Sequence, residues 1–188
     1  MRIDTQNTTK ALTTCALLAA LSVIFARLII PMPNEFTRFS IEAVPIFIAG
    51  MLYGPIAGAL VGFVADFIGA LISGYGFNPI FCVPPILYGV CAGLFRPLLR
   101  RKCSVLSIAS AFSPAVIFGS IFYQSASLAW VYGKGNFLPK FLSFLGSRTI
   151  QFTITFVLDV IIVYFLYRSN IFTLAKLWPV EKEKRNDN

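Results

Sequence analysis

A succession of long apolar runs is the feature of this sequence that most constrains its fold. Five of the runs approach the roughly 20 residues that a helix needs to cross a bilayer. They cover Thr9–Ile30, Pro55–Ser73, Pro79–Phe95, Ser104–Val131 and Ser147–Tyr167. A sixth run, Ile41–Tyr53, is shorter and contains a proline and a glycine. It fits either a tilted, broken helix or a segment buried among the other helices.

The composition agrees with this pattern of runs. Of the 188 residues, 57% are hydrophobic and only 13% are charged, whereas soluble domains carry about 25% charged residues. Because this number of charged residues cannot cover the core of a soluble protein, the apolar residues must face lipid. We therefore predict an all-α integral membrane protein with six transmembrane helices. Residues 1–170 form the membrane domain and residues 171–188 a cytoplasmic tail, with breaks expected at Gly54-Pro55 and Arg96–Lys102.

The distribution of lysine and arginine predicts the orientation, because cytoplasmic loops carry the excess positive charge. With the N-terminus inside, the inner segments hold eleven such residues: Arg2, Lys10, Arg96, Arg100, Arg101, Lys102, Arg168, Lys176, Lys182, Lys184 and Arg185. The outer segments hold five: Arg27, Arg38, Lys134, Lys140 and Arg148. Both termini are therefore expected in the cytoplasm of a multi-pass protein of the prokaryotic plasma membrane. Because the basic clusters flank the membrane without interleaved aromatic platforms, we expect no nucleic-acid partner.

The residues for soluble catalysis are missing from the sequence. There is no histidine, which removes the commonest general base and metal ligand. No phosphate-binding Gly-x-x-x-x-Gly-Lys-Ser/Thr loop and no Gly-x-Ser-x-Gly elbow occur, and the four cysteines form no Cys-x-x-Cys pair. We therefore expect neither an enzyme nor a metal site, and any energy input must come from a partner or a gradient.

Two aspartates lie inside predicted spans, Asp66 in the third and Asp159 in the sixth. Charges inside a membrane are costly and are functional candidates by default. They could pair with polar groups, line a cavity or carry protons, so a stand-alone proton-coupled secondary transporter remains an alternative. Such carriers are often built from inverted repeats, and the first three spans show no convincing correspondence with the last three.

Small residues recur at four-residue spacing, which lets helix backbones approach closely. Ala16 and Ala20 show this spacing in the first span, and the second and third spans continue it with Gly50, Gly54, Gly58 and Gly62. For the glycines we expect internal packing. The two alanines fit internal packing and docking of another membrane protein equally well.

The predicted outer loops combine aromatic rings, amides and guanidinium groups, notably in the glycine-rich segment 73–79. Rings stack on a flat ligand, amides bind its polar edges and arginines bind its anionic groups. This combination suits a heteroaromatic ligand with carboxylates. The competing interpretation is an interfacial aromatic belt with cationic side chains; it accounts well for Trp130 and Tyr132 but less well for the glycine-rich turn.

In order along the chain, three motifs resemble the substrate-binding S components of energy-coupling factor (ECF) vitamin transporters. They are Ala16-x-x-x-Ala20, the turn at Gly50–Pro55 and Gly62-x-x-x-Asp66-x-x-Gly69, and the resemblance covers about residues 9–170. It implies a subunit that captures a vitamin outside the cell and has no ATPase of its own. It also implies a transmembrane coupling subunit and two cytoplasmic ATPase subunits as partners, with Ala16 and Ala20 contributing to docking.

Within that family, the sequence is most similar to the folate-specific members. The similar parts are the Arg27 end of the first span, the segment Ala65–Ala70, the turn before Pro79, and Arg148 with Gln151. The chain departs from the folate pattern Phe-Pro-Gly-Phe at residues 77–81, so riboflavin, pantothenate and a queuosine precursor remain alternative ligands. No cofactor is expected besides the ligand. The candidate substrate-binding residues are Arg27, Arg38, Glu42, Asp66, Tyr75, Gly76, Phe77, Asn78, Tyr123, Arg148 and Gln151.

Overall fold

A computed structural model describes residues 5–26, 30–31, 38–39, 41–73, 76–101, 103–133 and 137–169. Over these residues the chain is a bundle of helices with one small strand pair. Three helical stretches are long and apolar enough to span a membrane, namely Pro55–Ser73, Val105–Tyr132 and Phe137–Arg168. Three shorter apolar stretches accompany them: Thr9–Phe25, Ala43–Tyr53 and Pro79–Leu94. Within the described residues, these six stretches confirm the predicted helical membrane bundle.

Helix α2 (Ala43–Tyr53) lies at the centre of the bundle. All ten residues from Ala43 to Leu52 are buried, as expected for a helix that is apolar on every side. The interpretation as a short segment buried among the others is therefore confirmed. Gly54, with a φ of 101°, ends α2, and its conformation is one that residues with a Cβ rarely adopt. Helix α3 (Pro55–Ser73) begins at the next residue, as predicted.

Helices α3 and α4 (Val83–Leu94) pack backbone against backbone at their glycines. A Cβ at Gly58 would lie 2.5 Å from the carbonyl oxygen of Gly89, and one at Gly62 would lie 2.5 Å from that of Pro85. A Cβ at Gly50 of α2 would also collide with the Gly89 carbonyl. The internal packing predicted for the glycine series is thus confirmed at these positions.

The fifth span is one continuous helical stretch made of three segments, two α-helical and one π-helical. It consists of α6 (Val105–Pro114), the π-helix η2 (Ala115–Tyr123) and α7 (Gln124–Tyr132). It starts as predicted, because the Ser104 hydroxyl caps α6 by accepting a hydrogen bond from the Ser107 amide at 3.3 Å. The π-helix directly follows Pro114, whose ring removes a helical hydrogen bond.

The last helix, α8 (Phe137–Arg168), begins ten residues before the predicted start at Ser147. The outer segment expected to hold Lys134, Lys140 and Arg148 is therefore not a loop over most of its length but part of this helix. Apolar residues in segment 137–145 recur at helical spacing, and Pro139 lies in the first turn, where a helix tolerates proline. Arg148 consequently lies inside α8 rather than at its start.

Two other boundaries also differ from prediction. Helix α1 (Thr5–Phe25) ends five residues before Ile30. Strand β1 (Ile30–Pro31) instead pairs antiparallel with β2 (Arg38–Phe39), and the prolines that follow in the sequence disfavour helix before them. The expected break at Arg96–Lys102 is largely a short helix, α5 (Arg96–Arg101), with Leu99 fully buried. The Arg96 guanidinium donates to the Leu52 carbonyl at 2.5 Å, which ties α5 to α2.

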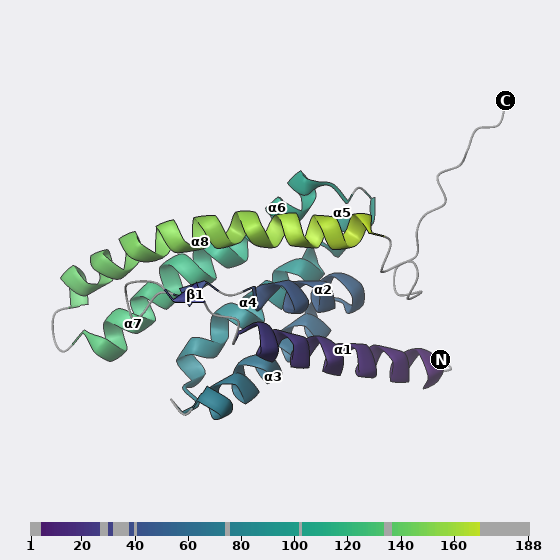
Figure 1. The fold of residues 1–188 in the computed structure, drawn as a ribbon, viewed down its shortest axis with the longest axis horizontal. Coiled ribbons are helices and arrows are strands. Elements are labelled where there is room, and N and C mark those ends of the chain that lie inside the picture. The colour runs from purple at the N-terminus through teal and green to yellow at the C-terminus, as the bar shows by residue number, and fades with distance from the viewer. Residues whose placement is uncertain are drawn as a thin grey trace.

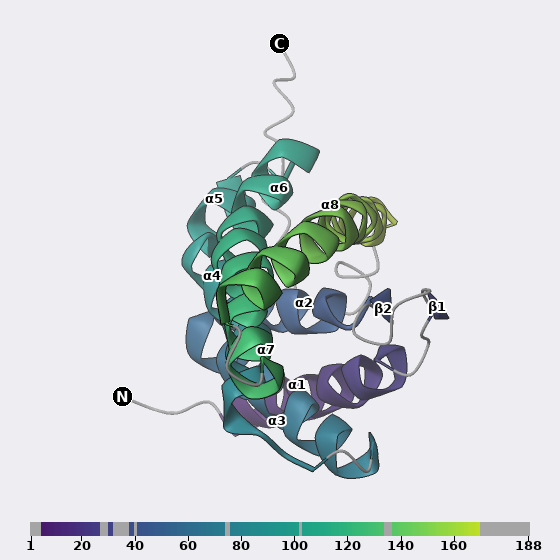
Figure 2. The same cartoon turned by 90° about the vertical axis from the view of Figure 1, so that its left-hand side faces the viewer.

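The helices are arranged with α8 along one side of the bundle and α1 and α3 along the opposite side (Figure 1). Figure 2 shows α2 between α8 and α1. The start of α1 and the end of α8 lie at the same end of the bundle (Figure 1), as an even number of spans requires. The predicted tail of residues 171–188 lies outside the described residues.

Candidate functional site: a buried polar cluster

A stripe of polar side chains runs along the buried face of α8. Its members recur at spacings of three and four residues, which places them on one face of a helix. They are Arg148, Gln151, Thr155 and Asp159, with exposed fractions of 7%, 5%, 7% and 1%. Polar groups buried in a membrane bundle face the bundle interior and mark candidate ligand or ion sites.

Helices α2 and α4 bring further polar groups to this stripe. The Tyr88 hydroxyl of α4 shares a buried hydrogen bond of 2.8 Å with the Ser120 hydroxyl of η2. Tyr88 is within electrostatic range of Glu42, Arg148 and Asp159. Among the described residues, the cluster therefore combines the Arg148 cation, the Glu42 and Asp159 carboxyl groups and a hydroxyl pair, from the residue before α2 and from α4, η2 and α8.

The N-terminal end of α2 is fixed from a second side. The Ser22 hydroxyl of α1 donates to the Glu42 carbonyl oxygen at 2.8 Å, and Ser22 is only 2% exposed. The strand that carries Arg38 also lies beside α8. Helix α1, strand β2 and helix α8, which are far apart in the sequence, thus lie near the start of α2.

Arg148 has an aromatic contact as well as a charged environment. Its guanidinium lies 5.6 Å from the centre of the Phe152 ring, one turn further along α8. Such cation–π contacts are stronger where water is excluded. A buried guanidinium with an aromatic neighbour can bind a carboxylate through two parallel hydrogen bonds.

Other candidate residues lie away from this cluster. The Asp66 carboxyl of α3 lies within interaction range of the Cys82 thiol. The Phe77 ring packs edge-on against the outward-facing Phe63 and Phe67 rings of α3, at centroid distances of 6.2 Å and 5.0 Å. None of these contacts joins Asp66 or Phe77 to the α8 stripe.

The glycine-rich turn acts locally as a helix cap. The Asn78 side-chain oxygen accepts a hydrogen bond from the Ile80 amide at 3.1 Å and starts the 3₁₀ helix η1 (Pro79–Cys82). Gly76 has a φ of 77° and an exposed position. Tyr123, partly buried, ends η2. Arg27 and Tyr75 lie outside the described residues, as does the Arg38 side chain.

Sequence reasoning missed four polar members of the cluster: Ser22, Tyr88, Ser120 and Thr155. One signal for Thr155 was available, because the polar residues of α8 recur at helical spacing. Ser22, Tyr88 and Ser120 are single polar residues in apolar runs, and their meeting depends on how four helices pack. No periodicity in one helix predicts that meeting.

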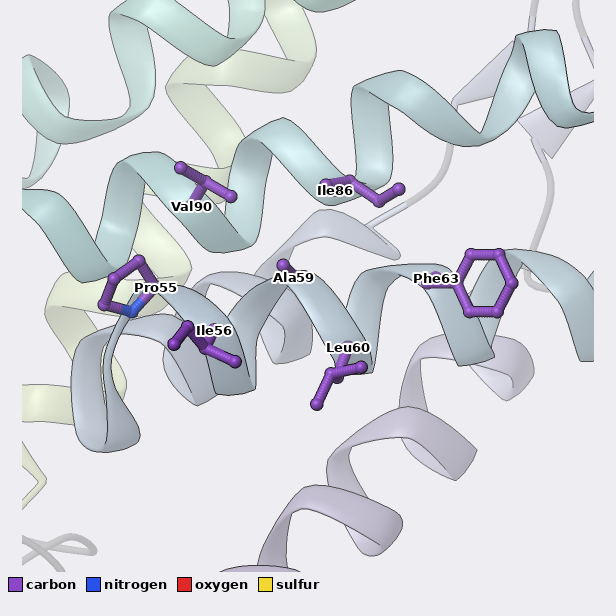
Figure 3. A pocket seen from close by; sticks show the side chains of 7 residues that line it. All are labelled: Pro55, Ile56, Ala59, Leu60, Phe63, Ile86 and Val90. Atoms are coloured by element: carbon purple, nitrogen blue, oxygen red, sulfur yellow. The ribbon is translucent and has the colours of Figure 1, made fainter.

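A groove of about 360 Å³ lies on the surface between α3 and α4 (Figure 3). None of its lining side chains carries a hydrogen-bonding group; they are Pro55, Ile56, Ala59, Leu60, Phe63, Ile86 and Val90. Because a polar ligand needs a few convergent polar groups, this groove suits hydrocarbon, and the α8 stripe is the better candidate for recognition.

Ala16 and Ala20, the small residues of α1, are both exposed in the structure, while the intervening Leu18 and Ala19 are buried. The alanines are therefore not packed inside the bundle. Their exposed face leaves room for the close approach of another helix.

A bundle of apolar, membrane-length helices with a polar cluster in its interior defines a class of protein, the polytopic membrane proteins. The particular family follows from comparison with known proteins. Residues 10–172 match the family model described as ECF transporter, substrate-specific component, and the chain belongs to this family. The resemblance seen in the sequence is thereby confirmed, as is the membrane localisation.

Similar proteins include UPF0397 proteins of Streptococcus pneumoniae. Those of strains CGSP14 and serotype 19F (G54) are 29% and 30% identical over 112 residues, covering 60% of this chain and 59% of the relative. The matched part thus spans less than two thirds of these relatives.

Two solved structures have the same fold. A crystal structure of FolT bound with folic acid has a TM-score of 0.70 at 24% identity, covering 85% of this chain and 93% of that one. The S-component for biotin from an ECF-type ABC transporter has a TM-score of 0.61 at 20% identity, covering 93% and 98%.

Proposed function

We propose that this protein is the vitamin-binding component of an ECF importer and that its ligand is folate. The family membership supports the transport role, and the chain shares its fold with FolT, which was crystallised with folic acid. The fold is also shared with a biotin component, so the polar groups of the site, and not the fold, must decide the ligand.

The observation that carries the proposal is the buried guanidinium of Arg148, 7% exposed, in the polar stripe of α8. The glutamate tail of folate carries carboxylates, and arginine binds a carboxylate through two parallel hydrogen bonds. Gln151, one turn further along, adds an amide that can donate and accept hydrogen bonds at polar atoms of the same ligand.

The ligand that accompanies the purified protein tests this proposal. We expect extraction and mass spectrometry to identify a folate in stoichiometric amount, and added folate to raise the melting temperature because it binds only the folded state. The panel contains folate, riboflavin, pantothenate, biotin and a queuosine precursor. A retained or stabilising ligand other than folate would replace folate in the assignment, and no response to any vitamin would count against the binding role itself.

We further propose that the energy for uptake comes from partner subunits, namely a transmembrane coupling subunit and two cytoplasmic ATPases. The exposed position of Ala16 and Ala20 on α1 supports docking of the coupling subunit there. Without a nucleotide-binding loop in its sequence, the chain has no means of its own to use ATP.

A further inference from the structure

The deeper end of the polar cluster contains two carboxylates. Asp159 is only 1% exposed, and it is within electrostatic range of Glu42 at the start of α2. Tyr88 is within range of both carboxylates. Among the residues that the structure describes, the Asp159 Oδ1 atom is buried without a hydrogen-bond partner.

A buried carboxylate oxygen without a donor is costly, since its lost hydration is not replaced. Nearly all buried polar atoms in native proteins therefore have partners, and an exception calls for an explanation such as an absent ligand. The nearby hydroxyl pair does not supply the partner, because Tyr88 and Ser120 share one hydrogen bond of 2.8 Å and neither hydroxyl bonds the Asp159 Oδ1 atom. An N–H donor brought by a ligand would supply the partner that Oδ1 lacks.

The position of Asp159 on α8 sets the shape of that ligand. Asp159 lies on the same buried stripe as Arg148, and at 1.5 Å rise per residue the two positions are about 16 Å apart along the helix. A cation at one end and a carboxylate at the other complement an elongated ligand, anionic at one end and rich in N–H donors at the other.

We propose that Asp159 is the specificity-determining residue for the ring end of the ligand. It accepts hydrogen bonds from adjacent N–H groups of an amino-substituted heteroaromatic ring, such as the 2-amino and N3–H groups of a pterin. Glu42, within electrostatic range of Asp159, adds to the negative field that favours donors. This inference rests on the proposed function, because it takes the Arg148 end of the stripe as the end that binds the ligand's carboxylates.

The Asp159 carboxylate, which only accepts hydrogen bonds, also predicts which rings bind poorly. A ring with a carbonyl oxygen in place of the 2-amino group would set an acceptor against the Asp159 carboxylate. Two hydrogen-bond acceptors that face each other in a site without water repel. Such a mismatch lowers the affinity for the wrong ligand more than the loss of an apolar contact does.

The test compares two ligands that differ only at this group. Pterin-6-carboxylate and lumazine-6-carboxylate, in which oxygen replaces the 2-amino group, are titrated by calorimetry into the purified ligand-free protein, with folate alongside. We expect the wild type to prefer the pterin by at least about tenfold. In Asp159→Asn the affinity for folate should fall about 10- to 100-fold and the preference should disappear. Thr153→Ala, on the exposed face of α8, is the control and should behave as wild type.

Each outcome decides the inference. Equal affinity of the wild type for the two ligands overturns it, whether or not Asp159→Asn folds. An Asp159→Asn protein that keeps the pterin preference also overturns it while leaving folate as the ligand. Retention of a vitamin without a pterin ring, with no binding of either test ligand, removes the folate assignment itself and the inference with it.

Discussion

At the scale of single residues, Arg148 is the side chain on which the proposed ligand depends most. Replacing it by alanine removes the buried cation, and we expect the dissociation constant for folate to rise by the equivalent of about 1.5 to 3 kcal/mol, the value of a hydrogen bond to a charged group. Arg168→Ala, at the exposed end of the same helix, is the matched control. Isothermal titration calorimetry measures both, and an unchanged dissociation constant in Arg148→Ala would remove Arg148 from the site.

The glycines of α3 allow a second prediction at this scale. In Gly58→Ala the new Cβ would lie 2.5 Å from the backbone oxygen of Gly89, and backbone cannot move aside as a flexible side chain can. We expect the overpacking to lower the free energy of unfolding by about 1 to 3 kcal/mol.

Gly69→Ala is the control for that change, because a Cβ at Gly69 would meet nothing within 4 Å. Alanine also favours helix over glycine, so this variant should be as stable as the wild type or slightly more so. Thermal unfolding in one detergent compares the two variants. Equal melting temperatures would contradict the close α3–α4 packing.

At the scale of elements, α1 presents the face proposed for docking. Ala16→Trp or Ala20→Trp would prevent close approach of a partner helix. We expect either change to abolish vitamin uptake in cells while leaving ligand binding by the purified component intact. Leu17→Trp, which exchanges one large side chain for another at an exposed position of α1, should preserve both.

Uptake and binding are measured separately, by radiolabelled vitamin in cells and by calorimetry on purified protein. Loss of uptake and binding together in the alanine variants would indicate damage to the fold and would contradict a docking role. Normal uptake in both would show that the partner binds another face.

The elements differ in how well their limits could be predicted. Helix α3 begins at Pro55 and ends at Ser73 as expected, because a glycine-proline pair and a following glycine-rich turn mark both ends chemically. Helix α8 begins ten residues before the predicted start, because the prediction assigns Lys140 to an outer segment. A hydropathy profile locates the apolar part of a helix, and it does not show that the helix continues through a less apolar segment such as 137–146.

At the scale of the whole molecule, the charge distribution predicts which end of the bundle faces the cytoplasm. Arg101 and Lys140 are both exposed, at the end of α5 and near the start of α8. In a cysteine-free background, Lys140→Cys should react with a membrane-impermeant maleimide on intact cells. Arg101→Cys should react only after the membrane is permeabilised. The reverse pattern would invert the predicted topology.

The sequence by itself determined the class of protein and the number of spans. The length of an apolar run and the charges that flank it are local properties, and they decide for each segment separately whether it crosses the bilayer. The sequence also contained Arg148 and Gln151, two of the buried polar residues. Only the tertiary structure decided that α2 is central, that Tyr88 bonds Ser120, and that Glu42 and Asp159 come within electrostatic range of each other. The reason is physical: in a membrane protein the lipid-facing and core-facing surfaces are both apolar, so hydropathy does not separate them. Which polar groups share one interior depends on how the helices pack, and that packing includes backbone contacts that only glycine allows, such as those of Gly58 with Gly89.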